Sequence, residues 1–309
     1  MPPAPSTLRR DQPAAGILPS VGRPVIVGIL NATPDSFHDG GRYADPVSAI
    51  ARGKKLFSDG AAWVDVGGLS TRPGSSEISV DEEIARVSPV LSGLTSAIPS
   101  PGLLSIDTYR SAAARAALDA GATAINDVSG FSLDPSMCEF AASAKCPVVI
   151  NHMKGAPKTM QADPRYDSIW DELLAFFEDR LNRFVRAGGA EEQIVLDPGI
   201  GFGKTLDHNL DILRHIRRLH ALGRPVMLGC SRKSFIHDIL SRPSSVFSNS
   251  SPDLLHSSPS LPTPSPEDRL PGSLAAAGWA ALEGVDFLRV HDAAETAQFL
   301  AVFGALRHG

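Results

Sequence analysis

Residues 103–127, LLSIDTYRSAAARAALDAGATAIND, contain a complete strand–helix–strand unit. The apolar run at 103–106 is typical of a buried strand, and the alanine-rich segment 110–120 has helical spacing. Gly121 supplies the usual stop at a helix C-terminus, just before a second apolar run at 123–126. Because two strands joined through a helix run parallel in one sheet, this unit predicts an α/β fold with a parallel sheet.

The same alternation repeats outward from this unit in both directions along the chain. Eight apolar runs are predicted to be strands: 25–30, 63–66, 103–106, 123–126, 147–151, 194–197, 225–228 and 286–290. Segments with helical spacing lie between them, for example at 46–59, 81–94, 110–120, 167–187 and 207–221. Eight buried parallel strands favour a closed (β/α)8 TIM barrel over an open doubly wound sheet, and 309 residues suit one such domain.

The composition is that of an ordinary globular protein, with 43% hydrophobic and 20% charged residues. A formal net charge of -5 gives no general affinity for nucleic acid. No apolar run is long enough to span a bilayer, and the start of the sequence lacks the apolar centre of a secretory signal. We therefore expect neither a nucleic-acid nor a membrane partner, and a cytoplasmic protein, or a mitochondrial one if the source is eukaryotic.

Two segments do not follow the strand–helix alternation. Residues 1–22 are expected to form a disordered tail, and residues 23–307 the barrel domain. Residues 242–266, RPSSVFSNSSPDLLHSSPSLPTPSP, are dominated by Ser and Pro and cannot bury enough apolar surface to offset their ordering entropy. We interpret this segment as a disordered surface insertion near the seventh helix; a partner-binding or regulatory loop is the alternative.

Polar side chains follow all eight predicted strands, at the ends where barrel enzymes place their chemistry. Lys233, Arg289 and His291 bring positive charge to the ends of the last two strands, which is the usual phosphate position of this fold. Carboxylate and amide groups stand at the ends of other strands: Asp107, Asn126 and Asp197. Any one of these acids or amides alone could be a helix cap, but together they suit the N–H donors of a flat, nitrogen-rich heterocycle. The sequence thus predicts a ligand with a polar ring at one end and a polyanion at the other.

A nucleotide-binding loop and a zinc cluster are weaker interpretations of the same sequence. Residues 198–205, PGIGFGKT, follow a predicted strand but have Pro198 where a phosphate-binding loop needs Gly. The three cysteines form no C-x-x-C pair, and no two histidines have zinc-ligand spacing. A metal, if used, is therefore expected to be Mg2+ held by oxygen atoms and by substrate phosphate.

The strand ends together resemble the motifs of the dihydropteroate synthase family. The matching stretches occur in the family's order over roughly residues 25–295: NATPDSFHDGG, GGLSTRPGS, SIDTYR, AINDVSG, NHMKGAPKTMQ, LDPGIGFGKT, GCSRKSF and RVHD. The resemblance implies a pterin-binding TIM barrel, usually a homodimer, that uses Mg2+ and is a target of sulfonamides. It implies condensation of 6-hydroxymethyl-7,8-dihydropterin pyrophosphate with p-aminobenzoate. The Ser/Pro insertion is atypical of compact bacterial members and resembles eukaryotic, for example fungal, versions.

The resemblance also implies roles for individual residues. The catalytic candidates are Asn31, Asp35, Asp39, Thr71, Arg72, Lys233, Arg289 and His291. Asn31 would also hold Mg2+. Pterin pyrophosphate would be bound by Thr71, Asp107, Asn126, Asp197, Lys233, Arg289 and His291. The p-aminobenzoate pocket would be formed by Phe37, Pro73, Phe202 and Ser234.

Two other functions are compatible with the same barrel. A pterin-dependent methyltransferase would also bind a pterin at strand ends, but it has no need for both SRKS at 231–234 and RVHD at 289–292. A non-catalytic pterin-binding module would have no reason to keep the loops at 31–41 and 68–75 intact. The favoured interpretation is substitution at the pterin methylene, in which pyrophosphate leaves, the neutral aniline nitrogen attacks, and the two loops exclude water.

Overall fold

The structure is a computed structural model that describes residues 24–33, 45–69, 77–99, 102–156, 159–241 and 265–308. The expected tail at 1–22 and nearly all of the expected insertion at 242–266 lie outside these residues, so both interpretations stay predictions. Within the described part of the chain, no helix combines the length and apolar character needed to cross a membrane.

Eight parallel strands form one sheet in the order β6-β5-β4-β3-β2-β1-β8-β7. The strands are β1 (Val25–Asn31), β2 (Trp63–Gly67), β3 (Leu103–Asp107), β4 (Ala124–Asp127), β5 (Val148–Asn151), β6 (Ile194–Asp197), β7 (Met227–Leu228) and β8 (Phe287–Val290). The two ends of this order meet through a parallel bridge between Leu196 and Val226. The predicted (β/α)8 barrel is therefore confirmed.

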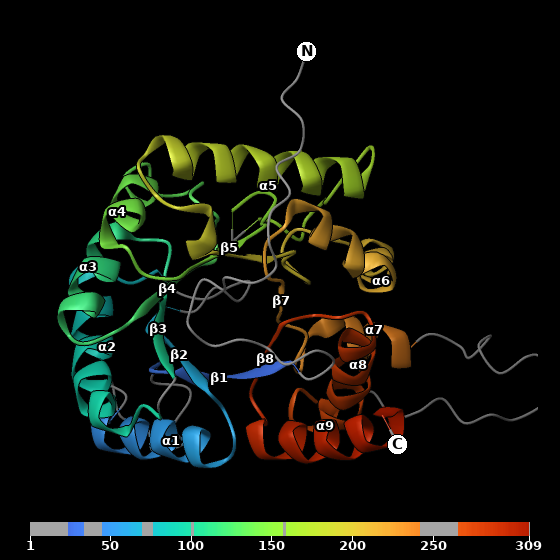
Figure 1. The fold of residues 1–309 in the computed structure, drawn as a ribbon, viewed down its shortest axis with the longest axis horizontal. Coiled ribbons are helices and arrows are strands. Elements are labelled where there is room, and N and C mark those ends of the chain that lie inside the picture. The colour runs from blue at the N-terminus through green and yellow to red at the C-terminus, as the bar shows by residue number, and fades with distance from the viewer. Residues whose placement is uncertain are drawn as a thin grey trace, which may run out of the picture.

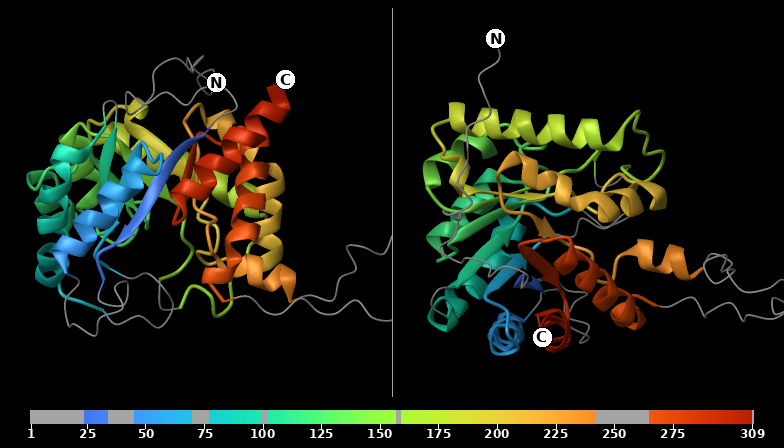
Figure 2. Two further views of the ribbon diagram at one scale, coloured as in Figure 1. Left: turned by 90° about the horizontal axis from the view of Figure 1, so that it is seen from below. Right: turned by 45° about the vertical axis from the view of Figure 1, so that its right-hand side comes forward.

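Helices surround the strands in chain order (Figure 1), and two further views show the same arrangement (Figure 2). They are α1 (Pro46–Ser58), α2 (Val80–Leu94), α3 (Ser111–Asp119), α4 (Met137–Ala144), α5 (Ile169–Arg186), α6 (Leu206–His215), α7 (Ser234–Leu240), α8 (Leu270–Leu282) and α9 (Ala293–His308). Short 3-10 helices are η2 (Thr95–Ala97), η3 (Glu191–Gln193), η4 (Ile216–Leu222) and η7 (Glu267–Arg269). Several helix starts are fixed by side-chain caps, as where Asp45 and Thr205 accept first-turn N–H groups of α1 and α6.

Two apolar clusters hold the barrel together. One lies inside the sheet and takes one residue from each strand: Val27, Trp63, Leu103, Ala124, Val149, Val195, Met227 and Phe287. The other fills the space between the sheet and the helices, with residues such as Leu56, Val66 and Ile106. Because side chains alternate faces along a strand, the inner cluster also fixes which residues point into the barrel further along each strand.

Two elements differ from the expectation. The predicted strand 225–228 contributes only Met227–Leu228 to the ladder, since Pro225 has no N–H and uses its carbonyl to accept from Leu196 N at 2.9 Å. The predicted helix 207–221 ends as α6 at His215 and continues as the 3-10 helix η4 up to Leu222. Both changes lie next to the closure of the barrel between β6 and β7.

Candidate active site

The inward face of the barrel changes from apolar to polar toward the carboxyl ends of the strands. On six strands, the residue two positions after the member of the inner apolar cluster is polar or charged: Asp65, Ser105, Asn126, Asn151, Asp197 and Arg289. Ile29 and Gly229 occupy the same level in the two remaining strands. Asp107 and His291 follow two residues further on, at the ends of β3 and β8. The strand period thus gathers the predicted pterin residues at one end of the barrel.

Arg289 is held between two carboxylates. Its Nε donates to Asp65 Oδ2 and its Nη2 donates to Asp107 Oδ2, both at 2.6 Å. Asn126 Nδ2 also donates to Asp65 Oδ2, at 2.8 Å. The structure therefore brings together three of the predicted residues, Asp107, Asn126 and Arg289, through a fourth that the sequence analysis did not select.

Asp197 and Lys233 lie close to Arg289, around Gly229. A Cβ placed on Gly229 would lie 3.7 Å from Asp197 Oδ2, 3.7 Å from Lys233 Nζ and 3.9 Å from Arg289 Cβ. Lys233 Nζ donates to the carbonyl of Ile200 and lies 4.6 Å from the centre of the Phe202 ring. Gly229 thus leaves room for a methyl group beside an acid and two cations.

Burial shifts the proton affinities of these groups. It raises the pKa of Asp107 to about 7, although the charge of Arg289 opposes this shift and Asp65 adds to it. Burial also raises the pKa of Asp197, against the charge of Lys233. The pKa of Lys233 falls to about 8 because burial disfavours its charge, while Asp197 partly restores it. Perturbed acids and a perturbed amine in one place are typical of functional sites.

His291 and the segment after β7 are tied to each other. His291 Nδ1 lies 3.1 Å from Ser231 Oγ, and its carbonyl accepts from Arg52 of α1 at 3.1 Å. Arg232 forms a two-pronged ion pair with Asp292, with Nε to Oδ2 at 2.9 Å. Arg232 has a left-handed backbone, with φ of 58°. These contacts fix the SRKS and RVHD motifs side by side.

The remaining predicted residues divide into two groups. Asp35, Phe37, Asp39, Thr71, Arg72 and Pro73 lie outside the described residues. Asn31, at the end of β1, is described; a Cβ on neighbouring Gly67 would lie 3.9 Å from Asn31 Oδ1 and 3.6 Å from Asp107 Oδ2. Ser234 is exposed at the first position of α7. Asn31 therefore lies next to the polar site described above.

The sequence matches a family of known proteins over most of its length. The family model described as pterin binding enzyme matches residues 27–291. The dihydropteroate synthase of Escherichia coli is 38% identical over 292 residues, which cover 94% of this chain and 95% of that protein. The corresponding protein of Synechocystis is 39% identical over 284 residues, with 92% and 90% covered. The chain belongs to the dihydropteroate synthase family.

Solved dihydropteroate synthases share the fold. The Yersinia pestis enzyme, in complex with a sulfonamide drug, has a TM-score of 0.81 and 37% identity, covering 95% of this chain and 98% of its own. The Xanthomonas albilineans enzyme with 4-aminobenzoic acid has a TM-score of 0.79 and 38% identity, with 93% and 94% covered. The same enzyme with 7,8-dihydropteroate has a TM-score of 0.77 and 35% identity, with 94% and 96% covered. The chain is accordingly an enzyme of the transferase class.

Asp65 is the residue that sequence reasoning missed in this member of the dihydropteroate synthase family. It lies in the middle of β2, is 1% exposed and points into the barrel. Its signal in the sequence is the motif WVDVG at 63–67, where an acid stands inside an apolar strand. An acid at that place is costly unless it is hydrogen-bonded or paired. The sequence could have flagged Asp65 on this ground, but its partners come from three other strands.

A second buried polar pair joins the loops after β5 and β6. Lys204 is 3% exposed, and its Nζ lies 2.8 Å from His152 Nδ1 and 3.1 Å from the carbonyl of Phe202. Burial lowers the pKa of His152 to about 2, so the imidazole is neutral and Nδ1 can accept. The lysine of the GFGK motif therefore fixes the backbone at Phe202 and does not act as a nucleotide-loop lysine.

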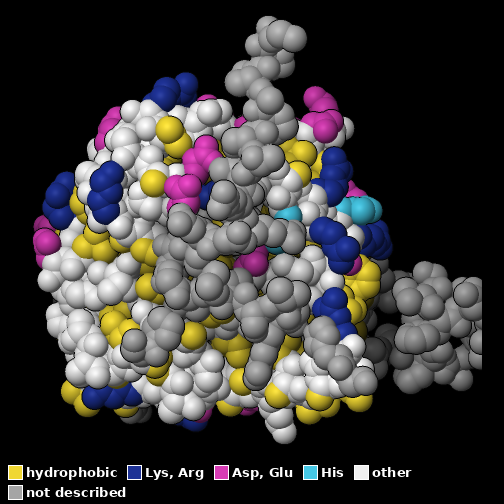
Figure 3. Space-filling model, in the orientation of Figure 1, with side chains coloured by type: hydrophobic (Ala, Val, Ile, Leu, Met, Phe, Trp, Pro, Cys, Tyr) yellow, Lys and Arg dark blue, Asp and Glu magenta, His cyan; other side chains and the backbone are white. Residues whose placement is uncertain are grey.

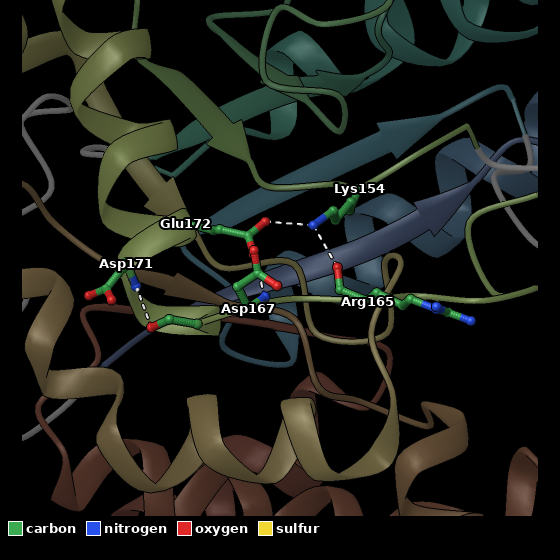
Figure 4. Close-up of a pocket in the computed structure, with 6 residues that line it drawn as sticks. Lys154, Arg165, Asp167, Asp171 and Glu172 are labelled. Carbon is green, nitrogen blue, oxygen red and sulfur yellow. Dashed lines mark hydrogen bonds and ion pairs between the residues drawn. The ribbon is translucent and has the colours of Figure 1, made fainter.

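Lys154 of the NHMK motif does not join the central site. It lines a surface pocket at the start of α5 together with Arg165, Asp167, Ser168, Asp171 and Glu172 (Figure 4). Its Nζ donates to Glu172 Oε2 at 2.5 Å and to the carbonyl of Arg165 at 2.6 Å (Figure 4). The positive charge that follows β5 is thus neutralised locally, away from Lys233 and Arg289.

Proposed function

We propose that this protein condenses 6-hydroxymethyl-7,8-dihydropterin pyrophosphate with p-aminobenzoate, giving 7,8-dihydropteroate and pyrophosphate. The observation that carries the proposal is the group of Asp107, Asn126, Asp197, Lys233 and Arg289 at one end of the barrel. One relative of the same fold, the Xanthomonas albilineans enzyme, was solved both with 4-aminobenzoic acid and with 7,8-dihydropteroate, which are a substrate and the product of this reaction.

The pterin ring would bind to the acids and the amide. Asp107, Asn126 and Asp197 offer oxygen acceptors from β3, β4 and β6, which suit the several N–H donors along the edge of a pterin. They stand on barrel strands, so their positions are fixed before the ligand arrives. Lys233 would meet an acceptor atom of the same ring, beside the space that Gly229 leaves open.

The leaving group would bind to the cations. The bond from the methylene carbon to oxygen breaks with its electron pair going to pyrophosphate, and Arg289 and His291 would stabilise the charge that develops there. The lone pair of the aniline nitrogen forms the new carbon–nitrogen bond. That nitrogen loses its proton to solvent only after attack, so the step needs no strong general base. Asp35, Asp39, Thr71 and Arg72 would complete the catalytic set from the two loops.

Mg2+ is the metal that fits the donors at this site. Among the described residues, no group of three or more His, Cys, Asp or Glu side chains could hold a metal ion. Asn31 brings a carboxamide oxygen next to the site, and the other ligands would come from the substrate phosphates, as Mg2+ prefers. When bound, the ion would neutralise part of the pyrophosphate charge.

The p-aminobenzoate would lie on the Phe202 side of the pterin site. Phe202 lies below Lys233, and Ser234 follows directly at the start of α7, where it can meet the benzoate carboxylate. Phe37 and Pro73 would close the pocket from the two loops, which together would keep water from the cationic centre. Family membership also supports a homodimer that acts in the cytoplasm.

The test is an assay of pyrophosphate release from purified protein with Mg2+ present. We expect release only when pterin pyrophosphate and p-aminobenzoate are both added, with 7,8-dihydropteroate formed in equal amount. Release with pterin pyrophosphate alone would indicate hydrolysis rather than condensation. Binding of the pterin without any turnover would favour the non-catalytic module, and methyl transfer from a methylated pterin would favour the methyltransferase.

A further inference from the structure

Asp65 is at the centre of a buried hydrogen-bond network below the proposed pterin site. Its carboxylate accepts from Ser105 Oγ, from Asn126 Nδ2 at 2.8 Å and from Arg289 Nε at 2.6 Å. These three partners stand on β3, β4 and β8, so one side chain of β2 connects four strands. Trp63, one inward position earlier on β2, donates to the same Ser105 Oγ at 2.7 Å.

The network fixes which end of the Asn126 amide faces the ligand. A side-chain amide has a donor end and an acceptor end, and an ionised carboxylate can only accept. Asp65 therefore requires Nδ2 of Asn126 on its own side, which turns Oδ1 the other way. With a neutral partner in place of Asp65, either orientation of the amide would be satisfied, and the acceptor toward the ligand would no longer be guaranteed.

The same carboxylate fixes Arg289. Asp65 holds Nε and Asp107 holds Nη2, so the plane of the guanidinium is set by two acids from adjacent strands. A planar cation held at two corners keeps its orientation when a ligand arrives. Asp65 thus acts on both the amide and the cation that the proposed function assigns to the pterin pyrophosphate.

We propose that Asp65 is a positioning residue that sets the specificity of this site for a pterin, by presenting the acceptor of Asn126 and the plane of Arg289 to the ring. The inference rests on the proposed function. Asp65 itself lies below these side chains and is 1% exposed, so it acts through them and not by touching the ligand.

The test compares Asp65→Asn with a matched control, Asp127→Asn. Asp127 lies next to Asn126, is also fully buried and also accepts three hydrogen bonds, but from Ser129 N, Ser129 Oγ and Phe131 N. Calorimetry with 6-hydroxymethylpterin measures affinity, thermal melts measure stability, and steady-state kinetics measure KM for each substrate. We expect Asp65→Asn to weaken pterin binding by at least about tenfold and to raise KM for pterin pyrophosphate, with KM for p-aminobenzoate changed less than twofold.

We expect the control to lose stability as Asp65→Asn does, yet to bind the pterin within twofold of the wild type. Equal losses of affinity in the two variants would reduce Asp65 to a stability role and overturn the proposal, and so would wild-type affinity in Asp65→Asn. Failure of the wild type itself to bind the pterin would instead count against the proposed function.

A double variant tests the orientation argument directly and serves if Asp65→Asn does not fold. In Asp65→Asn with Asn126→Asp, the amide at 65 can donate to a carboxylate at 126, whose second oxygen faces the ligand as an acceptor. Because Asn126 Nδ2 and Arg289 Nε donate to the same Asp65 oxygen, this variant restores the acceptor at 126 but loses the hydrogen bond to Arg289. Asn126→Asp alone would place two carboxylates against each other. We expect the double variant to bind the pterin more tightly than Asn126→Asp alone. A folded double variant that binds no better than Asn126→Asp would overturn the proposal.

Discussion

Arg289 and His291 belong to the same motif but make different contacts. Arg289 neutralises the buried carboxylates of Asp65 and Asp107, whereas His291 contacts the hydroxyl of Ser231. We expect alanine at either position to lower turnover by about 30- to 1,000-fold, the effect of about 2–4 kcal/mol lost from the transition state. Only Arg289→Ala should also lower the melting temperature markedly, because it leaves two acids without their cation.

Turnover and thermal melts measured on the same preparations separate these two effects. Arg289→Lys provides the control, since it keeps the charge but cannot bond both acids in one plane. Near-normal turnover in His291→Ala would show that pyrophosphate does not bind beside RVHD.

The raised pKa of Asp107 should make the free energy of unfolding fall as the pH rises. Burial raises its pKa to about 7 from the ordinary 3.8, so the folded protein holds this proton more tightly than the unfolded chain does. The stability it contributes is greatest below about pH 4 and is lost as the pH rises through about 7. Asp107→Asn resembles the protonated form at every pH.

We therefore expect wild type and Asp107→Asn to melt at similar temperatures near pH 4, and the melting temperature of the variant to rise relative to that of the wild type up to about pH 7. Thermal melts in one buffer series across this range measure the difference. A difference that stays constant from about pH 4 to about pH 7 would mean that Arg289 keeps Asp107 ionised throughout, and that the raised pKa is wrong.

At the scale of the elements, β7 shows what the sequence could and could not predict. The alternation of apolar runs with helices located all eight strands to within two residues at either end. It could not foresee that only Met227–Leu228 would join the ladder, because that depends on where β6 and β8 lie in space. The break between α6 and η4 is likewise set by packing and not by the helical period.

The site residues also divide into those that the sequence could predict and those that depend on packing in the closed barrel. Asp107, Asn126 and Asp197 could be proposed because they lie at or next to the ends of strands, and the barrel places strand ends together. Asp65 could not be selected by that rule, because it lies two residues before the end of β2. Its role depends on the inward alternation of four strands, which only the closed barrel brings into register.

The short β7 gives a prediction at its carboxyl end. A Cβ at Gly229 would meet Asp197, Lys233 and Arg289 at 3.7–3.9 Å, which is ordinary contact. Gly229→Ala should therefore fold normally, while its methyl group occupies space beside the proposed pterin ring. We expect the affinity for 6-hydroxymethylpterin to fall by about tenfold or more, equivalent to about 1.4 kcal/mol.

Gly304→Ala in α9 is the matched control, because a Cβ there meets nothing within 4 Å. It should keep the affinity for the pterin and gain slight stability from the helix preference of alanine. Unchanged pterin affinity in Gly229→Ala would place the ring elsewhere.

At the scale of the whole molecule, one face can be examined for the distribution of charge. On the face drawn in Figure 3, the coloured Lys and Arg side chains lie among Asp and Glu side chains, in keeping with a net charge of -5. Charged side chains cluster at the carboxyl end of the barrel, where Arg289 and Lys233 lie close to three acids. The charge at the proposed site is therefore set by a few fixed groups and not by the net charge of the protein.

Removing residues 242–264, between α7 and α8, would test whether the barrel needs them for stability and turnover. The segment before it ends at Ser241, and the segment after it resumes at Ser265; both residues are exposed. The residues after it matter to the site, because Arg269 Nη1 donates to the carbonyl of Arg232 at 3.0 Å and Ser273 Oγ accepts from Arg232 N at 2.9 Å. These two contacts hold the backbone that carries Lys233.

Replacing residues 242–264 by a short Gly/Ser linker should therefore spare both stability and turnover, provided that Ser265 and everything after it is kept. Closure entropy changes only with the logarithm of loop length, so the free energy of unfolding should change by about 1 kcal/mol or less. Arg269→Ala in the full chain is the contrasting variant: it removes a contact to the SRKS backbone and should lower turnover more than the deletion does. Thermal melts and the pyrophosphate assay measure both. A folded deletion variant without turnover would show that the removed residues contribute to the site, because the contacts of Arg269 and Ser273 to Arg232 would remain in place.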